Sequence, residues 1–130
     1  MISELVKALP NKNVINWISH TQSERLFLSV ITIGEIRKGI TRLPNSKKKH
    51  QLTNWLNTLL EDYHARIYPI DLTVAENWGI IQANAEKNGT PVASVDSMIA
   101  AVAQTYNLII VTRNENDFTA TNVAILNPWK

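Results

Sequence analysis

Short runs of large apolar and β-branched residues alternate along this chain with longer amphipathic segments, and this alternation limits the possible folds more than any other feature. Buried strands are predicted at 26–31, 108–112 and 123–126, and a short edge strand at 66–70, where Pro69 lacks a backbone donor. Between them, apolar side chains recur at spacings of three and four, as on one face of a helix. Strands that alternate with helices form parallel sheets covered by helices on both faces. We therefore expect an α/β fold of three layers.

Capping residues and helix breakers set the bounds of the predicted helices. Ser46 is a good N-cap for a long amphipathic helix. Thr73 and Glu76 resemble a capping box at the start of the next helix, which Gly89 would end. The other helices are predicted at 2–9, around Val14, Trp17 and Ile18, from near Ile33 towards Pro44, and from near Asp96 to Asn107.

The length and composition indicate one globular domain, 1–130, without a repeat or an interdomain linker. Apolar residues make up 45% of the chain and charged residues 18%, which excludes a disordered or fibrous protein. Because there is no cysteine, disulfides and thiolate metal sites are excluded. Glu4 and Lys7 interrupt the apolar core that a signal peptide needs, and no apolar stretch is long enough to span a bilayer. We therefore expect a cytoplasmic protein with no membrane partner.

Three acidic residues are predicted to meet at one edge of the sheet. Glu35 follows the first buried strand in the first turn of its helix, Asp96 opens the last helix, and Asp117 follows the strand 108–112. Ligands in such folds bind outside the carboxyl ends of the strands. Carboxylates crowded there repel one another, and a Mg²⁺ or Mn²⁺ ion removes that conflict because hard cations take oxygen ligands. The sequence thus predicts a metal site that could activate water and stabilise charge on a phosphoryl oxygen.

Each acid also has an interpretation that needs no metal. Asp96 is a favoured N-cap residue, and Glu35 would be favoured in a first turn by the helix dipole. Asp117 could stabilise a turn with Asn114 and Asn116. Taken singly, each of these roles is at least as common as a functional one. Their shared edge is what favours the metal site.

Positive charge is concentrated in one segment, although the net charge of +2 does not by itself indicate nucleic-acid binding. Between Arg37 and His50 lie six of the thirteen Lys and Arg residues, with no acid among them. Arg37 and Lys38, beside Glu35, could contact the phosphates of a nucleic acid or could belong to a solvated helix connection. Arg113, next to the predicted site, could likewise pair with a phosphate or form a salt bridge to a neighbouring acid.

Four segments resemble motifs of PIN-domain nucleases. The segment 28–39 (LSVITIGEIRKG) is similar to the one that carries the family's second acid, and 91–101 (PVASVDSMIAA) to the one that carries the third. The segments 108–118 (LIIVTRNENDF) and 126–129 (LNPW) resemble the final motif and the usual tail. The most similar group is the VapC-type toxins, including FitB-like members, of type II bacterial toxin–antitoxin pairs. The resemblance runs over nearly the whole chain.

The resemblance implies a PIN-like fold and an activity. By their place in the motifs, the catalytic metal-site acids would be Glu35, Asp96 and Asp117, and the supporting or substrate-binding residues Thr112, Asn114, Arg37 and Arg113. The implied reaction is hydrolysis of RNA phosphodiester bonds with Mg²⁺ or Mn²⁺. The implied partners are an RNA substrate, a cognate antitoxin that covers the active-site groove, a second copy in a homodimer, and DNA only through the antitoxin complex.

The chain departs from the family at its start. Members open with a short apolar strand and the residues Asp-Thr-Asn-Val, followed by a segment like 2–5, and here Met1 stands where that valine would be. We therefore expect the first, central strand and the first of four acids to be missing, as from a GTG valine codon read as the initiating methionine. Weakened Mg²⁺ binding and little ribonuclease activity would follow. The alternative function is a catalytically inactive PIN-like module that binds the antitoxin.

Overall fold

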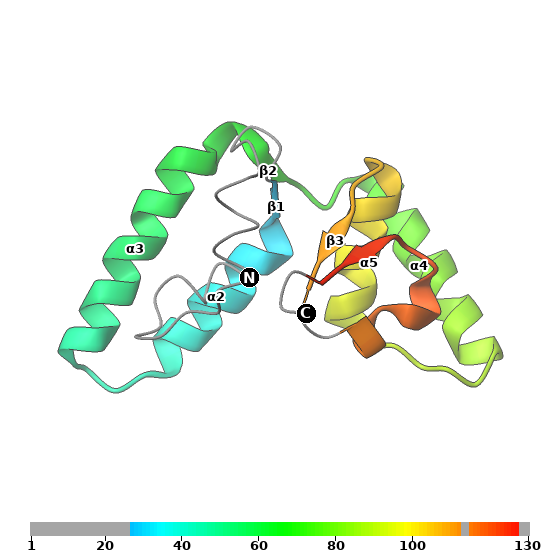
Figure 1. Cartoon of the computed structure of the whole chain (residues 1–130), viewed down its shortest axis with the longest axis horizontal. Helices are drawn as coiled ribbons and strands as arrows, with labels where there is room; N and C mark the ends of the chain where they lie inside the picture. Colours follow the sequence, from blue (N-terminus) through cyan, green and yellow to red (C-terminus); the bar gives the residue numbers. More distant parts are fainter. Residues whose placement is uncertain (1–26, 113–114, 128–130) are drawn as a thin grey trace.

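The computed structural model describes residues 27–112 and 115–127. In chain order, its strands and α-helices are β1 (Leu28–Ser29), α2 (Val30–Arg42), α3 (Lys47–Tyr63), β2 (Ile67–Tyr68), α4 (Leu72–Lys87), α5 (Ser94–Thr105), β3 (Ile110–Val111) and β4 (Ile125–Leu126). Short 3₁₀ turns occupy His64–Arg66, Glu115–Asp117 and Thr119–Thr121. Figure 1 shows α2 and α3 as a hairpin on one side of the molecule and α4, α5 and β3 on the other.

All strand pairing among the described residues is parallel, which confirms the predicted α/β class. β1 pairs with β2, so that Leu28 lies opposite Ile67, and β3 pairs with β4, so that Ile110 lies opposite Ile125. The amide of Thr112 extends the second pair by donating to the carbonyl of Leu126 at 3.0 Å. Within the described ranges these are two separate two-stranded sheets with no strand joining them. All four predicted strands are present, each only two residues long.

The first predicted strand is shorter than expected because a serine caps the helix that follows it. The hydroxyl of Ser29 accepts a hydrogen bond from the amide of Thr32 at 3.1 Å, and α2 begins at Val30. The prediction of a start near Ile33 was therefore wrong by three residues. As a consequence, Glu35 lies in the second turn of α2 and not in the first.

The ends of α3 and α4 show which capping predictions were right. The amide of Lys49 donates to the hydroxyl of Ser46, which confirms that N-cap. The predicted capping box of α4 was wrong, because Asp71 is the N-cap and accepts from the amide of Val74 at 2.9 Å. Gly89 ends this helix as predicted, in the left-handed region at φ +70°.

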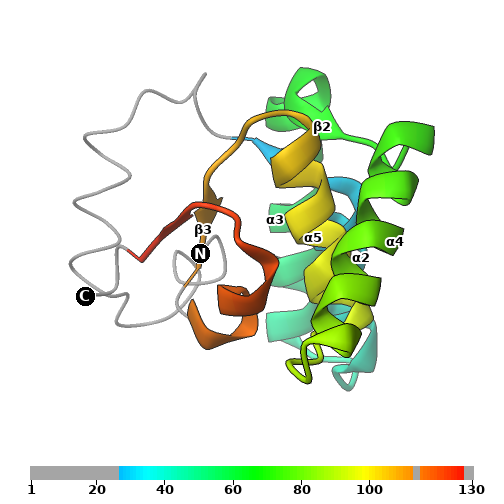
Figure 2. The same ribbon diagram turned by 90° about the vertical axis from the view of Figure 1, so that its right-hand side faces the viewer.

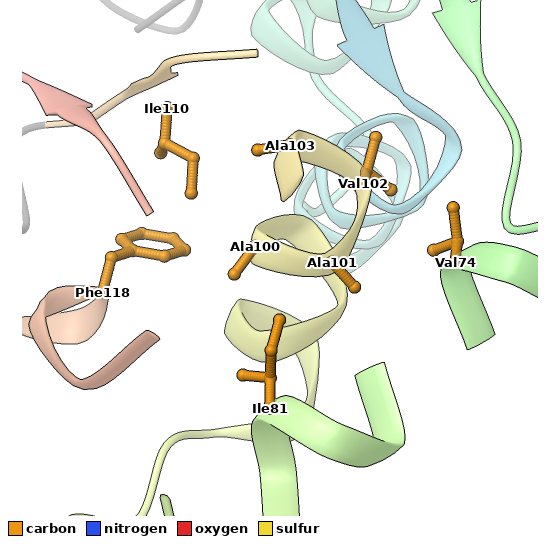
Figure 3. Close-up of a cluster of buried hydrophobic side chains, with 8 residues drawn as sticks. All are labelled: Val74, Ile81, Ala100, Ala101, Val102, Ala103, Ile110 and Phe118. Atoms are coloured by element: carbon orange, nitrogen blue, oxygen red, sulfur yellow. The ribbon is translucent and has the colours of Figure 1, made fainter. Parts of the chain in front are cut away.

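Side chains pack into two hydrophobic clusters. The α4–α5 cluster consists of Val74, Ile81, Ala100, Ala101, Val102, Ala103, Ile110 and Phe118 (Figure 3). The α2–α3 cluster consists of Leu28, Ile40, Leu56 and Leu59. Three alanines in the first cluster leave room for α4 to pack along α5, and the two helices run side by side in Figure 2. Trp78 packs against the first cluster and Trp55 against the second.

Some predictions concern residues outside the described ranges. The helices at 2–9 and around Trp17 lie there, and the missing first strand concerns the segment before them, so these stay predictions. Over the described part of the chain, no helix combines the length and the apolarity needed to cross a membrane.

Candidate functional site

Asp96 occupies the first turn of α5, in a partly buried position. The N-cap of this helix is Ala93, which makes no side-chain capping bond. The interpretation of Asp96 as a capping residue is therefore wrong. Its carboxylate instead lies near the positive end of the helix dipole, which favours negative charge.

Glu35 reaches the same region from another element. It is exposed on α2, and α2 packs against α5. Because Glu35 lies beyond the first turn, interaction with the dipole at the N-terminus of α2 does not explain it. The contact between α2 and α5 explains why residues 61 positions apart share a surface.

Asp117 lies at the end of the turn Glu115–Asp117, six residues after the end of β3. The next residue, Phe118, is only 5% exposed and points towards Ile110 and α5 (Figure 3). The turn is also tied to the residue after β4, because the side-chain amide of Asn127 donates a hydrogen bond to the carboxylate of Glu115 at 3.2 Å. The buried phenyl ring and this hydrogen bond hold the exposed Asp117 at the edge of the sheet. The proposed turn with Asn114 involves a residue outside the described ranges and stays a prediction.

The three carboxylates interact electrostatically at Asp96. Its pKa is raised above the usual 3.8, first by partial burial and then by the negative charges of Asp117 and Glu35. Both neighbours therefore lie close enough for their negative charges to disfavour ionisation of Asp96. The charges of the other two acids that the sequence singled out thus act on Asp96, although Glu35 follows β1 and Asp117 follows β3, which belong to two separate sheets.

The donor chemistry of this edge fits a hard divalent cation. Carboxylate oxygens are the ligands that Mg²⁺ and Mn²⁺ prefer, and a cation would relieve the repulsion that raises the pKa of Asp96. The side chains do not yet form a complete ligand set, since no three His, Cys, Asp or Glu residues within 27–112 and 115–127 are arranged to hold a metal ion.

The remaining predicted site residues differ in how they are placed. Arg37 is exposed on α2, two positions after Glu35, which turns it away from the face that carries the acid. Thr112 is partly buried directly after β3. Arg113 and Asn114 lie outside the described residues, so their predicted roles stay predictions.

Sequence reasoning missed a buried polar pair beneath Asp96. Ser97 is fully buried, and its hydroxyl donates to the side-chain carbonyl of Gln82 at 2.6 Å. The amide group of Gln82 donates in turn to the carbonyl of Val92 at 3.1 Å. Gln82 therefore connects α4 both to the segment before α5 and to the first turn of α5. A serine within the apolar stripe of a predicted helix was the available signal, because a buried hydroxyl needs a partner.

One hollow of the described surface lies elsewhere. It has a volume of about 460 Å³ and is lined mainly by the C-terminal part of α5, by Ile80 and Ile81, and by 120–124. None of its lining residues carries an ionisable side chain, and Asp96 is at the other end of α5. The hollow therefore lacks the groups that hydrolysis of a phosphodiester would need.

Comparison with known proteins places this geometry in a family. The PIN domain family matches residues 2–123. The chain is 37% identical to toxin FitB of Neisseria gonorrhoeae over 130 residues, which covers 99% of this chain and 94% of that protein. It is 34% identical to VapC ribonuclease Y4jK of Sinorhizobium fredii over 131 residues, with 100% and 94% covered. The structure of FitAB bound to an IR36 DNA fragment superposes with a TM-score of 0.93 at 35% identity, covering 99% of this chain and 91% of that one. The chain belongs to the PIN-domain family and is similar to its FitB and VapC toxins.

Proposed function

We propose that this protein is the toxin of a toxin–antitoxin pair and acts as a metal-dependent endoribonuclease. The observation that carries the proposal is the acid cluster at Asp96, whose pKa is raised first by partial burial and then by the charges of Asp117, in the turn after β3, and of Glu35, on α2. Relatives named as a toxin and as a ribonuclease, each matched over nearly the whole chain, support the same activity.

The position of each residue in the fold suggests its role in binding the metal ion or the RNA. Asp96, on the rigid first turn of α5, is the fixed ligand, while Glu35 and Asp117 are exposed and adjust to it. Mg²⁺ or Mn²⁺ bound there would supply a Lewis acid for the scissile phosphate and a more acidic water. Thr112, directly after β3, and Asn114 support the phosphate, and Arg113 neutralises the charge of the flanking RNA. Arg37 faces away from Glu35 on α2, so it would neutralise only RNA that lies beyond that face.

The substitution Asp96→Asn tests the catalytic proposal. RNA cleavage should fall by at least about 100-fold, because even the outer partners of metal ligands contribute roughly 10–100-fold. Thermal unfolding should be almost unchanged, and calorimetric titration should show weaker binding of Mn²⁺. Asp62→Asn is the matched control, since Asp62 is exposed on α3 and outside the cluster. Cleavage that survives in Asp96→Asn at the wild-type rate would refute the assignment.

We further propose that the protein is cytoplasmic, forms a homodimer, binds a cognate antitoxin and meets DNA only through that complex. The neighbour FitAB bound to DNA supports a complex of this kind. Co-purification with the product of the adjacent gene, followed by mass measurement of the complex, tests the partner and the stoichiometry. A strictly monomeric protein that retains nothing from the adjacent gene would contradict it.

A second candidate function is a catalytically inactive module that only binds the antitoxin. It is favoured by the finding that, among the described residues, no three acids form a metal-binding group as they stand. Both candidates predict antitoxin binding, and only the nuclease predicts Mn²⁺ binding and RNA cleavage by the same preparation. Antitoxin binding without either of the other two would select the inactive module.

A further inference from the structure

Positive charge is concentrated in the middle of the α2–α3 hairpin. From Ile36 to Leu60 the chain carries six Lys and Arg residues and no acid. The acids of the two helices lie outside this stretch, Glu35 just before it and Glu61 and Asp62 just after it. The stretch is therefore a positive surface whose first basic residue follows Glu35 by two positions.

The helical register arranges part of this charge in a row. Lys38 and Arg42 follow Glu35 by three and seven positions, so all three lie on one face of α2. At 1.5 Å per residue the row runs about 10 Å from Glu35 to Arg42. Both basic side chains are exposed, whereas Ile36 and Ile40 turn to the α2–α3 cluster.

The row continues across the tip of the hairpin with Lys47 and Lys48, but not with Lys49. Lys47 and Lys48 are exposed at the start of α3. The ammonium group of Lys49 instead donates to the carbonyl of Leu43 at 3.0 Å and to that of Thr41 at 3.4 Å. Those two hydrogen bonds hold the connection between α2 and α3, so Lys49 has a structural role.

We infer that Lys38, Arg42, Lys47 and Lys48 form a phosphate track for the single strand of RNA that leaves the acid cluster. This inference rests on the proposed function, because the track begins at Glu35. The acid cluster repels a polyanion, and a row of cations beside it compensates for that repulsion. At about 3.4 Å per stacked nucleotide, the 10 Å from Glu35 to Arg42 correspond to roughly three nucleotides.

Binding along the track should depend on phosphate charge and not on base identity. The row contains no aromatic side chain on which a base could stack, and Trp55 of α3 packs against the α2–α3 cluster. The contacts are therefore those of a positive surface with a phosphate backbone, whose affinity falls as salt rises.

Salt-dependent binding of a fluorescent single-stranded RNA of about twelve nucleotides, followed by anisotropy in EDTA, tests the track without cleavage. Each lost phosphate contact should reduce the slope of log K against log salt by about 0.7. The double variant Lys38→Gln/Arg42→Gln should thus reduce the slope by about 1.4 and weaken binding about 25-fold at ~0.1 M salt. Lys87→Gln, an exposed charge at the end of α4, is the control and should leave the slope unchanged.

Two further variants separate charge from stability. Lys47→Gln/Lys48→Gln should weaken binding of the long RNA and leave an RNA of about four nucleotides unaffected, because the short RNA ends before the tip. Lys49→Gln should lower the melting temperature without changing the slope. An equal loss of affinity in Lys87→Gln, or an unchanged slope in Lys38→Gln/Arg42→Gln, would overturn the inference.

The outcome is independent of whether the protein cleaves RNA. If wild-type protein cleaves RNA and the double variant keeps both its cleavage rate and its salt slope, the track is wrong and the nuclease stands. If wild-type protein cleaves nothing but the slope changes as expected, the nuclease is wrong and the track stands. If the double variant loses affinity only for an acidic peptide and not for RNA, the hairpin is a protein-binding surface and the inference fails.

Discussion

Gln82 should hold Asp96 in place although it touches no substrate. Its side chain accepts from Ser97 at 2.6 Å and donates to the carbonyl of Val92 at 3.1 Å. Both partners flank Asp96 within four residues. Replacing Gln82 by leucine roughly keeps the volume of the side chain and removes these two hydrogen bonds, so that the start of α5 is no longer tied to α4. It also removes a long, exposed hydrogen bond to the carboxylate of Glu86 at 3.4 Å within α4, which should contribute little.

The expected cost follows from the two lost hydrogen bonds. Each contributes about 1 kcal/mol net, so Gln82→Leu should lower the free energy of unfolding by about 2 kcal/mol. The hydroxyl of Ser97 keeps a second acceptor, the carbonyl of Ser94 at 3.0 Å, which avoids the larger penalty of a buried unsatisfied donor. With an unfolding entropy of about 2.1 cal/mol/K per residue over 130 residues, the melting temperature should fall by about 7 °C.

A double-mutant cycle with Ser97→Ala measures the pair directly. Unfolding in urea should give a coupling energy of about 1 kcal/mol between the two positions. If the two free-energy changes simply add, the hydrogen bond between Ser97 and Gln82 has no energetic role and the reasoning fails. Gln51→Leu, an exposed glutamine on α3, is the control and should stay within about 0.5 kcal/mol of the wild type.

The positioning effect requires a second readout. At a temperature where Gln82→Leu is fully folded, binding of Mn²⁺ should weaken and kcat should fall with little change in KM, because Asp96 is displaced while the RNA contacts remain. Gln82→Glu keeps the acceptor for Ser97 and should recover part of the loss. Unchanged Mn²⁺ affinity in the folded leucine variant would show that Gln82 is only structural.

Three further perturbations test the fold. Gly89→Ala should destabilise the protein by about 1 kcal/mol, because φ at Gly89 is +70°. Gly79→Ala, where an added methyl group meets no atom within 4 Å, should stabilise it by up to about 1 kcal/mol. Shifts of the melting temperature in the same direction for both variants would contradict this. Tyr106 donates to the carboxylate of Asp71, which lowers the pKa of Asp71 below 3.8 and raises that of Tyr106 above 10.0. In urea unfolding, the wild type should therefore be more stable than Tyr106→Phe by an amount that is constant from about pH 5 to 9. This difference should shrink as the pH falls through the lowered pKa of Asp71, and also as the pH rises through the raised pKa of Tyr106. A difference that does not depend on pH would refute the pairing. Phe118→Leu should cost about 1–2 kcal/mol, since the ring is 5% exposed in the α4–α5 cluster, and a loss below about 0.5 kcal/mol in urea would show that the ring is not packed as described.

Local patterns predicted those parts of the fold in which the deciding contacts are local. The N-cap at Ser46 and the stop at Gly89 depend on neighbours within five residues. The start of α4 depends on a distant one, because Tyr106 on the C-terminal side of α5 fixes the carboxylate of Asp71, and Thr73 is an equally acceptable cap by sequence alone. A local sequence pattern around residues 71–76 does not include such a distant partner and so does not reveal it.

The first strand was predicted too long for a related reason. Val30 and Ile31 are β-branched and favour a strand locally, yet both are helical in α2. Packing of Ile33 and Ile36 against the α2–α3 cluster outweighs that preference, and the hydroxyl of Ser29 starts the helix early.

The electrostatic link among the three acids agrees with the prediction from topology, whereas the contacts that support Asp96 were not predicted. The rule that ligands bind outside the carboxyl ends of parallel strands singled out Glu35, Asp96 and Asp117, and their role as a metal site stays a prediction. The link from Ser97 to Gln82 joins residues fifteen positions apart on different helices, so their meeting depends on how α4 packs along α5. The structural role of Lys49 within a uniformly basic run was hidden in the same way.

The division of the core into two clusters has a consequence for how this protein would register a ligand. Glu35 extends from the helix hairpin around Leu56, whereas Asp96 and Asp117 extend from the body around Ala100. A ligand that binds all three carboxylates therefore bridges two separately packed parts of the protein. Its binding free energy adds to the stability of the folded state. Slowed amide exchange deep in both bodies, far from any carboxylate, would then be the signature of occupancy.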